Sequence, residues 1–248
     1  MTNAKIEQVS DSVHVVAGTN VNWAIVTGDG GVTLVDAGYP GDTEAVVRSV
    51  REIGHDPADI AAVVLTHAHL DHIGAIPTLV EHFNVPVYTG AEEVRHAKRE
   101  YLQQITPVQM VQRLGSRRGI VWVGQTLRAV AGHIGMRVPT ATAVEAETLG
   151  GLPGGLVAVP TPGHTDGHTA YFMPSEGVLF SGDTLVTGHP LLRDTGLQLL
   201  PGFFNHDEEG TLASARALAA LPAEVLVPGH GRPIRENLSS LLGEFART

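Results

Sequence analysis

The seven residues THAHLDH, at positions 66–72, decide how this chain of 248 residues is interpreted. They place three imidazoles and one carboxylate between His67 and His72, although the whole chain has only 13 histidines. The apolar run AAVVL at 61–65 comes immediately before them and is short and β-branched, so we predict a buried strand that ends at the cluster. Imidazole and carboxylate groups are typical zinc ligands, which predicts a metal site that other segments must complete.

Three further apolar runs also end at residues that can bind metals. His164 follows LVAVPTPG, Asp183 follows VLFSG and His230 follows EVLVPG. In layered α/β proteins, sites form beyond the carboxyl ends of strands, so these segments are expected to meet the first cluster. The candidate ligands are therefore His67, His69, Asp71, His72, His164, Asp183 and His230. Seven ligands exceed the needs of one tetrahedral metal, so we predict two metals, with the two carboxylate oxygens of Asp183 suited to bridge them.

The composition excludes several classes of protein. The chain has no cysteine, which rules out disulfides, thiolate metal sites and cysteine nucleophiles. A hydrophobic content of 43% indicates a globular core, and the net charge of −10 argues against a nucleic-acid partner. No run approaches the roughly 20 apolar residues of a membrane span, and no apolar block near the N-terminus suggests a signal peptide. We therefore expect a cytoplasmic protein with no membrane partner.

Strand-like and helix-like segments alternate in two similar halves, which is typical of layered sheets covered by helices. The first half has predicted strands at 13–17, 22–27, 32–35, 62–65 and 85–88, helices at 42–53 and 73–83, and a mostly helical segment at 91–137. The second half has predicted strands at 143–149, 156–159, 169–172, 178–180 and 225–227, and helices at 211–220 and 234–245.

Together, HxHxDH at 67–72, TPGHTDGH around His164, SGDTL around Asp183 and PGHG around His230 resemble the metallo-β-lactamase superfamily, from residue 13 to the C-terminus. The resemblance implies an α/β (α+β) fold, an αββα four-layer sandwich, as one domain over 1–248 with a helical lid inserted at 92–139. It also implies two divalent metal ions, most often Zn²⁺, with iron or manganese as alternatives. One ion would be bound by His67, His69 and His164 and the other by Asp71, His72 and His230, with Asp183 shared. Asp36 matches an acid that orients a ligand histidine in the family.

The resemblance implies a hydrolase in which a hydroxide bridging the metals attacks a carbonyl carbon of a small-molecule ester, lactone or thioester. Asp71 would accept a proton from the water and deliver it to the leaving group. The ligand set favours the hydroxyacylglutathione hydrolase (glyoxalase II) and lactonase-like branch over true β-lactamases. Two departures leave the substrate open: 18 residues follow His230, fewer than in the glutathione thioesterases, and no tyrosine lies between 184 and 229, where the lactonases have one.

Three other functions remain open from the sequence. A mononuclear iron oxidoreductase resembling the persulfide dioxygenases shares the fold but uses fewer ligands than the chain retains. A phosphodiesterase or nuclease is supported only by the basic segment at 95–137, which holds eight basic side chains and one acid. A metal-binding scaffold without activity is the third alternative.

The basic segment also mixes in apolar residues, so it is interpreted either as a lid that recruits an anionic substrate with an apolar portion or as a subdomain that packs on the core or on a partner in a homodimer. The candidate residues of a substrate pocket are His168, His189, His206, Phe203 and Phe204.

Overall fold

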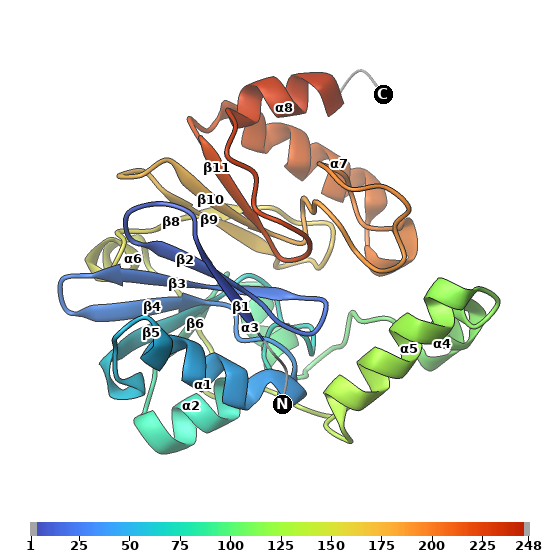
Figure 1. The fold of residues 1–248 in the computed structure, drawn as a ribbon, viewed down its shortest axis with the longest axis horizontal. Helices are drawn as coiled ribbons and strands as arrows, with labels where there is room; N and C mark the ends of the chain where they lie inside the picture. Colours follow the sequence, from blue (N-terminus) through green and yellow to red (C-terminus); the bar gives the residue numbers. More distant parts are fainter. Residues whose placement is uncertain (1–3, 246–248) are drawn as a thin grey trace.

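The computed structural model describes residues 4–245 and consists of two facing sheets with helices on their outer sides (Figure 1). The first sheet has the spatial order β1 (Lys5–Gln8), β2 (Val13–Ala17), β3 (Asn22–Gly28), β4 (Gly31–Val35), β5 (Ile60–Leu65), β6 (Val87–Thr89) and β7 (Thr142–Ala143). The second has the order β11 (Val225–Pro228), β10 (Val178–Gly182), β9 (Thr169–Met173) and β8 (Val157–Pro160). The predicted αββα four-layer sandwich is confirmed.

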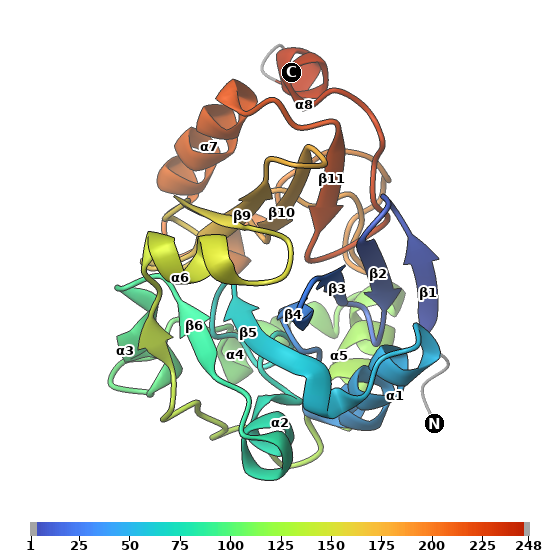
Figure 2. The same cartoon turned by 90° about the vertical axis from the view of Figure 1, so that its left-hand side faces the viewer.

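Helices α1 (Thr43–Glu52) and α2 (Ile76–Phe83) cover the first sheet, and α7 (Glu208–Ala217) and α8 (Leu238–Phe245) cover the second (Figures 1 and 2). The alternation of side chains along β3 explains the layering. Trp23 and Ile25 pack with α1 and α2, whereas Ala24 and Val26 face the second sheet. The central strands β3, β4 and β5 are thus largely apolar on both faces because both faces are covered. Within residues 4–245, no helix is long and apolar enough to cross a membrane.

The predicted lid contains three helices, α3 (Glu93–Ala97), α4 (Pro107–Arg113) and α5 (Arg117–Val130). Thr106 and Ser116 cap α4 and α5 by accepting hydrogen bonds from backbone amides, and α5 ends at Ala131, whose φ is 45°. Helices α4 and α5 project beside the sandwich in Figure 1. The segments 98–106 and 131–141 are not helical, so the predicted helical stretch is interrupted more than expected.

The structure departs from the predicted elements most clearly in three places. The predicted strand at 143–149 is instead the end of β7 followed by α6 (Ala146–Gly151), because Ala146, Glu147 and Leu149 are good helix formers after a two-residue strand. Strand β1 was missed because its short sequence, KIEQ, is polar and lies at the edge of the sheet. The last helix begins at Leu238, since Ile234 forms an isolated bridge with Leu226.

Candidate metal centre

The metal-capable side chains meet at one edge of the sandwich because several strands deliver their carboxyl ends there. Strand β4 runs parallel to β5, and β10 runs parallel to β11, so the residues after them emerge together. Ligand atoms lie within 4.8 Å of one another in three groups: His67, His69 and His164; His67, His72 and Asp183; and Asp71, His72 and His230. All seven predicted ligands therefore lie in one cluster.

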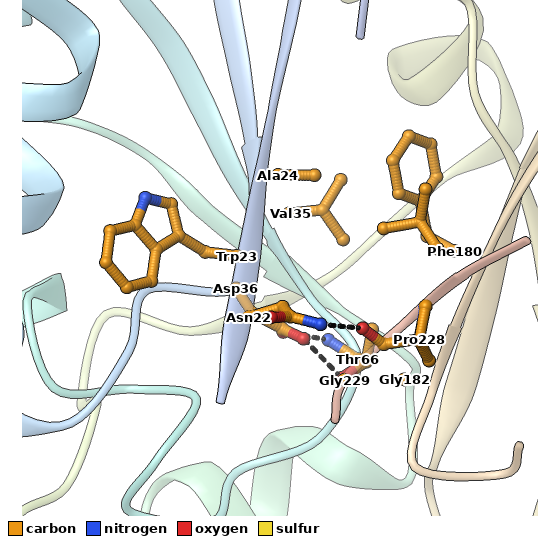
Figure 3. Close-up of a pocket in the computed structure, with 11 residues that line it drawn as sticks. Asn22, Trp23, Ala24, Val35, Asp36, Thr66, Phe180, Gly182, Pro228 and Gly229 are labelled. Atoms are coloured by element: carbon orange, nitrogen blue, oxygen red, sulfur yellow. Dashed lines mark hydrogen bonds between the residues drawn. The ribbon is translucent and has the colours of Figure 1, made fainter. Parts of the chain in front are cut away.

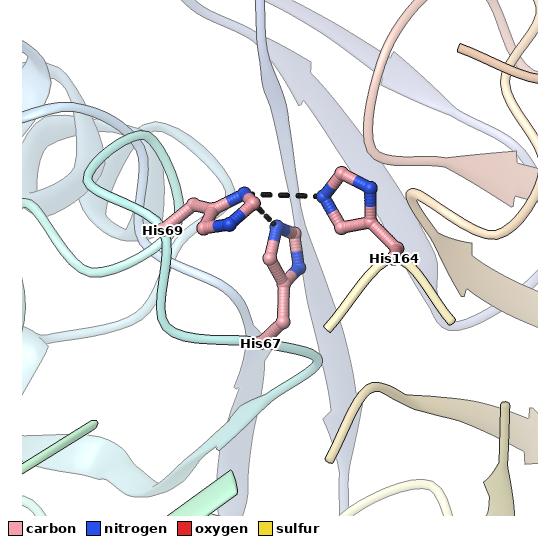
Figure 4. A group of neighbouring side chains, drawn as sticks. All are labelled: His67, His69 and His164. Atoms are coloured by element: carbon pink, nitrogen blue, oxygen red, sulfur yellow. Dashed lines mark hydrogen bonds between the residues drawn. The ribbon is translucent and has the colours of Figure 1, made fainter. Parts of the chain in front are cut away.

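The three-histidine group (His67, His69 and His164) is buried between the two halves of the chain (Figure 4). Nδ1 of His69 lies 3.0 Å from Nε2 of His67 and 3.1 Å from Nε2 of His164. On the side away from the cluster, the other nitrogen of each ring forms a hydrogen bond with an oxygen atom. His67 Nδ1 lies 3.1 Å from Thr66 Oγ1, and His69 Nε2 donates to the Gln103 carbonyl at 2.5 Å. His164 Nδ1 lies 2.9 Å from Asn205 Oδ1. His69 thus presents the opposite nitrogen from the other two.

The Asp71 group (Asp71, His72 and His230) lies on the other side of Asp183. Asp71 Oδ2 is 3.9 Å from His72 Nε2 and 3.6 Å from His230 Nε2. Nδ1 of His230 donates to the carbonyl of Asn20 at 2.5 Å. Asp71 is the most exposed of these side chains, at 17%, so it is the ligand nearest to solvent.

Asp36 orients His72, as the resemblance implied. The carboxylate accepts hydrogen bonds from the Thr66 amide, the Thr66 hydroxyl and His72 Nδ1, each at 2.8 Å. Its backbone is left-handed, with φ of 62°, a conformation that Asp and Asn tolerate better than most residues. Figure 3 shows Asp36 and Thr66 together with Asn22, whose amide donates to the Pro228 carbonyl and so ties β3 to the end of β11.

The donor set fits divalent metal ions. The carbonyls of Gln103 and Asn20 can only accept, so His69 and His230 carry protons on the outer nitrogens, and their inner nitrogens face the cluster. Nitrogen lone pairs that face one another at about 3 Å repel unless a cation lies between them. His72 Nε2 and Asp183 Oδ1 are also buried without any hydrogen-bond partner, which is costly for polar atoms unless they bind something.

The electrostatics of the two groups differ. Burial, reinforced by neighbouring histidines, holds the pKa of His67 and of His69 well below the usual value, so these imidazoles are neutral. Burial alone would lower the pKa of His72, but the carboxylates of Asp36, Asp183 and Asp71 raise it to about 10. The carboxylates therefore create a negative potential in which positive charge is stabilised.

Asp183 is held from behind by backbone geometry and by His168. Gly182, with φ of 51°, lets the chain turn after β10, and a Cβ on Gly229 would lie 2.2 Å from Asp183 Oδ1. The amide of Asp183 donates to His168 Nε2 at 3.0 Å, while His168 Nδ1 lies 2.8 Å from the Thr161 hydroxyl. His168 is 1% exposed and both its nitrogens form hydrogen bonds. It therefore supports Asp183 from behind, although the sequence predicted that it lines a substrate pocket.

A row of aromatic rings beside His230, called the aromatic wall below, consists of His189, Phe203, Phe204 and Trp122. The ring of His189 lies 5.2 Å from His230 and 5.2 Å from Phe204, and Trp122 of α5 lies 5.7 Å from Phe204. Phe203 contacts Phe204 at 4.4 Å between centroids. The structure thus brings His189, Phe203 and Phe204 together next to His230, and their role in a substrate pocket stays a prediction.

His206 is not part of that wall. It points to solvent, is 54% exposed and lies 3.7 Å from the exposed carboxylate of Asp166. It immediately precedes Asp207, which caps α7, and its role in a substrate pocket stays a prediction.

Helices α4 and α5 contact the loop that carries the aromatic wall. Arg118 donates to the Leu192 carbonyl at 2.8 Å, and the Arg113 guanidinium lies 4.2 Å from the centre of the Phe203 ring. Their outer surface leaves several apolar side chains more than half exposed: Val108, Val111, Ile120, Val121 and Leu127.

Sequence reasoning missed the residues that hold the outer nitrogens of the histidines. Gln103 and Asn20 act through backbone carbonyls, which carry no residue-specific signal, and Asn205 lies 41 positions from its partner His164. Only the folded chain brings these groups together.

The chain belongs to the metallo-β-lactamase superfamily, whose family model matches residues 16–230. The probable metallo-hydrolase YflN of Bacillus subtilis is 31% identical over 225 residues, covering 86% of this chain and 80% of that protein. A hydroxyacylglutathione hydrolase of Salmonella gallinarum is 26% identical, covering 88% of this chain and 73% of that protein. Among solved structures, TTHA1623 in a di-iron-bound form is 26% identical with a TM-score of 0.55, over 88% of this chain and 90% of that one. These similarities identify a metallo-hydrolase fold with His and Asp side chains that can hold divalent metals.

Proposed function

We propose that this protein is a dinuclear metal-dependent hydrolase that cleaves a carboxylic ester, thioester or lactone of a small molecule. The position of Asp183 carries the proposal. Its Oδ2 lies 3.4 Å from His164 Nε2 and 3.0 Å from His230 Nε2, and its Oδ1 lies 3.6 Å from His72 Nε2. One carboxylate therefore contacts both ligand groups, as a residue shared between two ions must.

Two ions bound there, for which we propose Zn²⁺, would supply Lewis-acid activation of a water and of the substrate carbonyl. The three-histidine group would hold one ion, the Asp71 group would hold the other, and Asp183 would be shared. The absence of cysteine leaves only nitrogen and oxygen donors for this role. The di-iron form of TTHA1623 makes iron the alternative to test.

Asp71 is the residue that we assign to proton transfer. Its carboxylate is the most exposed of the candidate ligands, and Oδ2 lies within 4 Å of both His72 and His230. It can accept a proton from the attacking water and release it to the leaving oxygen or sulfur at the solvent side. Asp36 and Asn20 meanwhile fix His72 and His230, so that no ring rotation is needed during the reaction.

The surroundings support a substrate that is anionic and has an apolar portion. The rings of His189 and Phe204, backed by the buried Trp122, offer a partly apolar surface next to His230. Arg113 stacks on Phe203 at the edge of the aromatic wall, and the segment at 101–144 contains no acidic residue. Cations beside an apolar surface favour a negatively charged substrate.

The test is a substrate screen on protein loaded with Zn²⁺, comparing thioesters, lactones, carboxylic esters, β-lactams and bis-p-nitrophenyl phosphate. We expect turnover of a thioester, lactone or ester that a chelator abolishes and added Zn²⁺ restores. Preference for bis-p-nitrophenyl phosphate over every carboxylic substrate would contradict the proposal and favour a phosphodiesterase.

A further inference from the structure

Helix α3 lies directly behind the HxH segment and carries three polar residues toward it. Glu93 and His96 are fully buried, and Arg99 follows the helix with a left-handed φ of 62°. The spacing of three residues places Glu93 and His96 on one side of α3, and Arg99 lies just beyond the end of the helix. None of them is a candidate ligand, so their burial next to the cluster needs another explanation.

Two of these residues hold both backbone groups of Ala68, which separates His67 from His69. The amide of Ala68 donates to Glu93 Oε1 at 2.6 Å. The carbonyl of Ala68 accepts from Arg99 Nη1 at 2.9 Å. The peptide planes on either side of Ala68 are therefore fixed, and with them the directions in which the two histidine side chains leave the backbone.

The third residue sets the orientation of the His69 ring. Glu93 Oε1 also accepts from His96 Nδ1 at 2.7 Å, which leaves a lone pair on His96 Nε2. That nitrogen accepts from the Gln103 amide at 3.2 Å, and the Gln103 carbonyl accepts from His69 Nε2. The chain of bonds ends with a lone pair on His69 Nδ1, directed into the three-histidine group.

The same carboxylate reaches the second half of the protein. Glu93 Oε2 accepts from the Thr165 hydroxyl at 2.7 Å, next to His164. The Gln103 side chain accepts from the Asp166 amide at 2.9 Å. Glu93 thus connects all three members of the three-histidine group, and it does so from inside the protein with three hydrogen-bond donors around it.

We propose that Glu93, His96 and Arg99 form an outer clamp that makes His69 present Nδ1 and holds the three-histidine group in position to bind a metal ion. They are positioning residues, since none contacts the reacting atoms. This role rests on the proposed function only for the identity of the bound ion. The clamp also determines the tautomer of His69 in metal-free protein, so that part of the proposal can be tested without any metal.

The test compares Glu93→Ala, Glu93→Gln and His96→Leu with the control Glu92→Gln, whose exposed side chain lies at the N-cap of the same helix. Zn²⁺ affinity is measured by chelator competition, the Co²⁺-loaded protein is examined by its visible absorption, and the His69 tautomer is read by ¹⁵N NMR of metal-free protein. Partners of this kind contribute about 10–100-fold to metal affinity. We expect a loss of that size for one of the two ions in Glu93→Ala and His96→Leu, with His69 no longer protonated only at Nε2.

Glu93→Gln should recover most of the affinity, because its carbonyl oxygen can still accept from Ala68 and His96 while its amide donates to the Thr165 hydroxyl. Wild-type affinity and an unchanged His69 tautomer in both Glu93→Ala and His96→Leu would overturn the clamp. If Glu93→Ala does not fold, His96→Leu decides alone. A wild-type protein that binds no metal would instead overturn the proposed function, and the tautomer measurement would still decide on the clamp.

Discussion

The substitution Asp36→Asn tests how the protein controls one metal ligand. Asn has the same shape as Asp and tolerates the left-handed backbone at this position, so the change alters hydrogen bonding and charge without adding backbone strain. The Thr66 amide can still donate to the remaining carbonyl oxygen. The new NH₂ group then faces the Thr66 hydroxyl, which can turn to accept, and His72 Nδ1, which cannot accept while it is protonated.

His72 must therefore lose its partner or move its proton to Nε2, the nitrogen that faces the site. Asp36 also supplies the leading favourable charge behind the raised pKa of His72, so its removal weakens the negative potential at the Asp71 group. Loss of such a partner costs about 10–100-fold in metal affinity, or about 1.4–2.8 kcal/mol.

We expect Zn²⁺ titration with a competing chelator to show one weakened ion in Asp36→Asn and one ion bound nearly as in the wild type. Asp29→Asn, a change in the exposed β3–β4 turn, serves as the matched control. Two ions bound to Asp36→Asn with the affinity of the wild type would refute the assigned role of Asp36.

Three further predictions concern the same site. Asp183→Ala should lose metal and hydrolytic activity together, while His206→Ala, a change at an exposed side chain, should keep both. Two ions per chain in Asp183→Ala, measured by elemental analysis, would exclude a role for Asp183 as the carboxylate shared between the ions. Gly229→Ala should reduce kcat/KM by at least about tenfold, since the new Cβ would lie 2.2 Å from Asp183 Oδ1. The control Gly150→Ala places its Cβ in open space and should leave kcat/KM unchanged. Equal activities of the two variants would contradict this prediction. Burial lowers the pKa of His168 from 6.5 to about 3, so the unfolded chain binds a proton that the folded chain does not. The free energy of unfolding that this residue contributes is fully present above pH 6.5 and is lost as the pH falls toward 3, by up to about 5 kcal/mol. Urea unfolding of metal-free protein between pH 7 and 4 should therefore show a shallower loss of stability in His168→Gln than in the wild type.

The sequence could predict the fold class and the meeting of the candidate ligands because both depend on strong local patterns. Apolar runs that stop at His or Asp mark strand ends, and parallel strands bring those ends to one edge. The spacing of His67, His69 and His72 directly after such a run therefore predicts a metal site without any tertiary information. The short polar strand β1 and the helix α6 were missed because their assignments depend on what the neighbouring elements cover.

The supporting residues could not be predicted because their roles depend on tertiary contacts. A carbonyl such as that of Gln103 or Asn20 has the same chemistry in every residue, so nothing in the sequence distinguishes it. His168 and His206 are both single histidines in loops, yet one is buried under Asp183 and the other is exposed. Glu93 is an ordinary helical acid in sequence, and only its burial against Ala68 reveals what it does.

Elemental analysis of protein purified without chelator tests the central claim most directly. Two ions per chain, with the second lost in Asp183→Ala, is the result that the geometry of the cluster predicts. A single iron per chain, accompanied by oxygen consumption in place of hydrolysis, would contradict the dinuclear hydrolase.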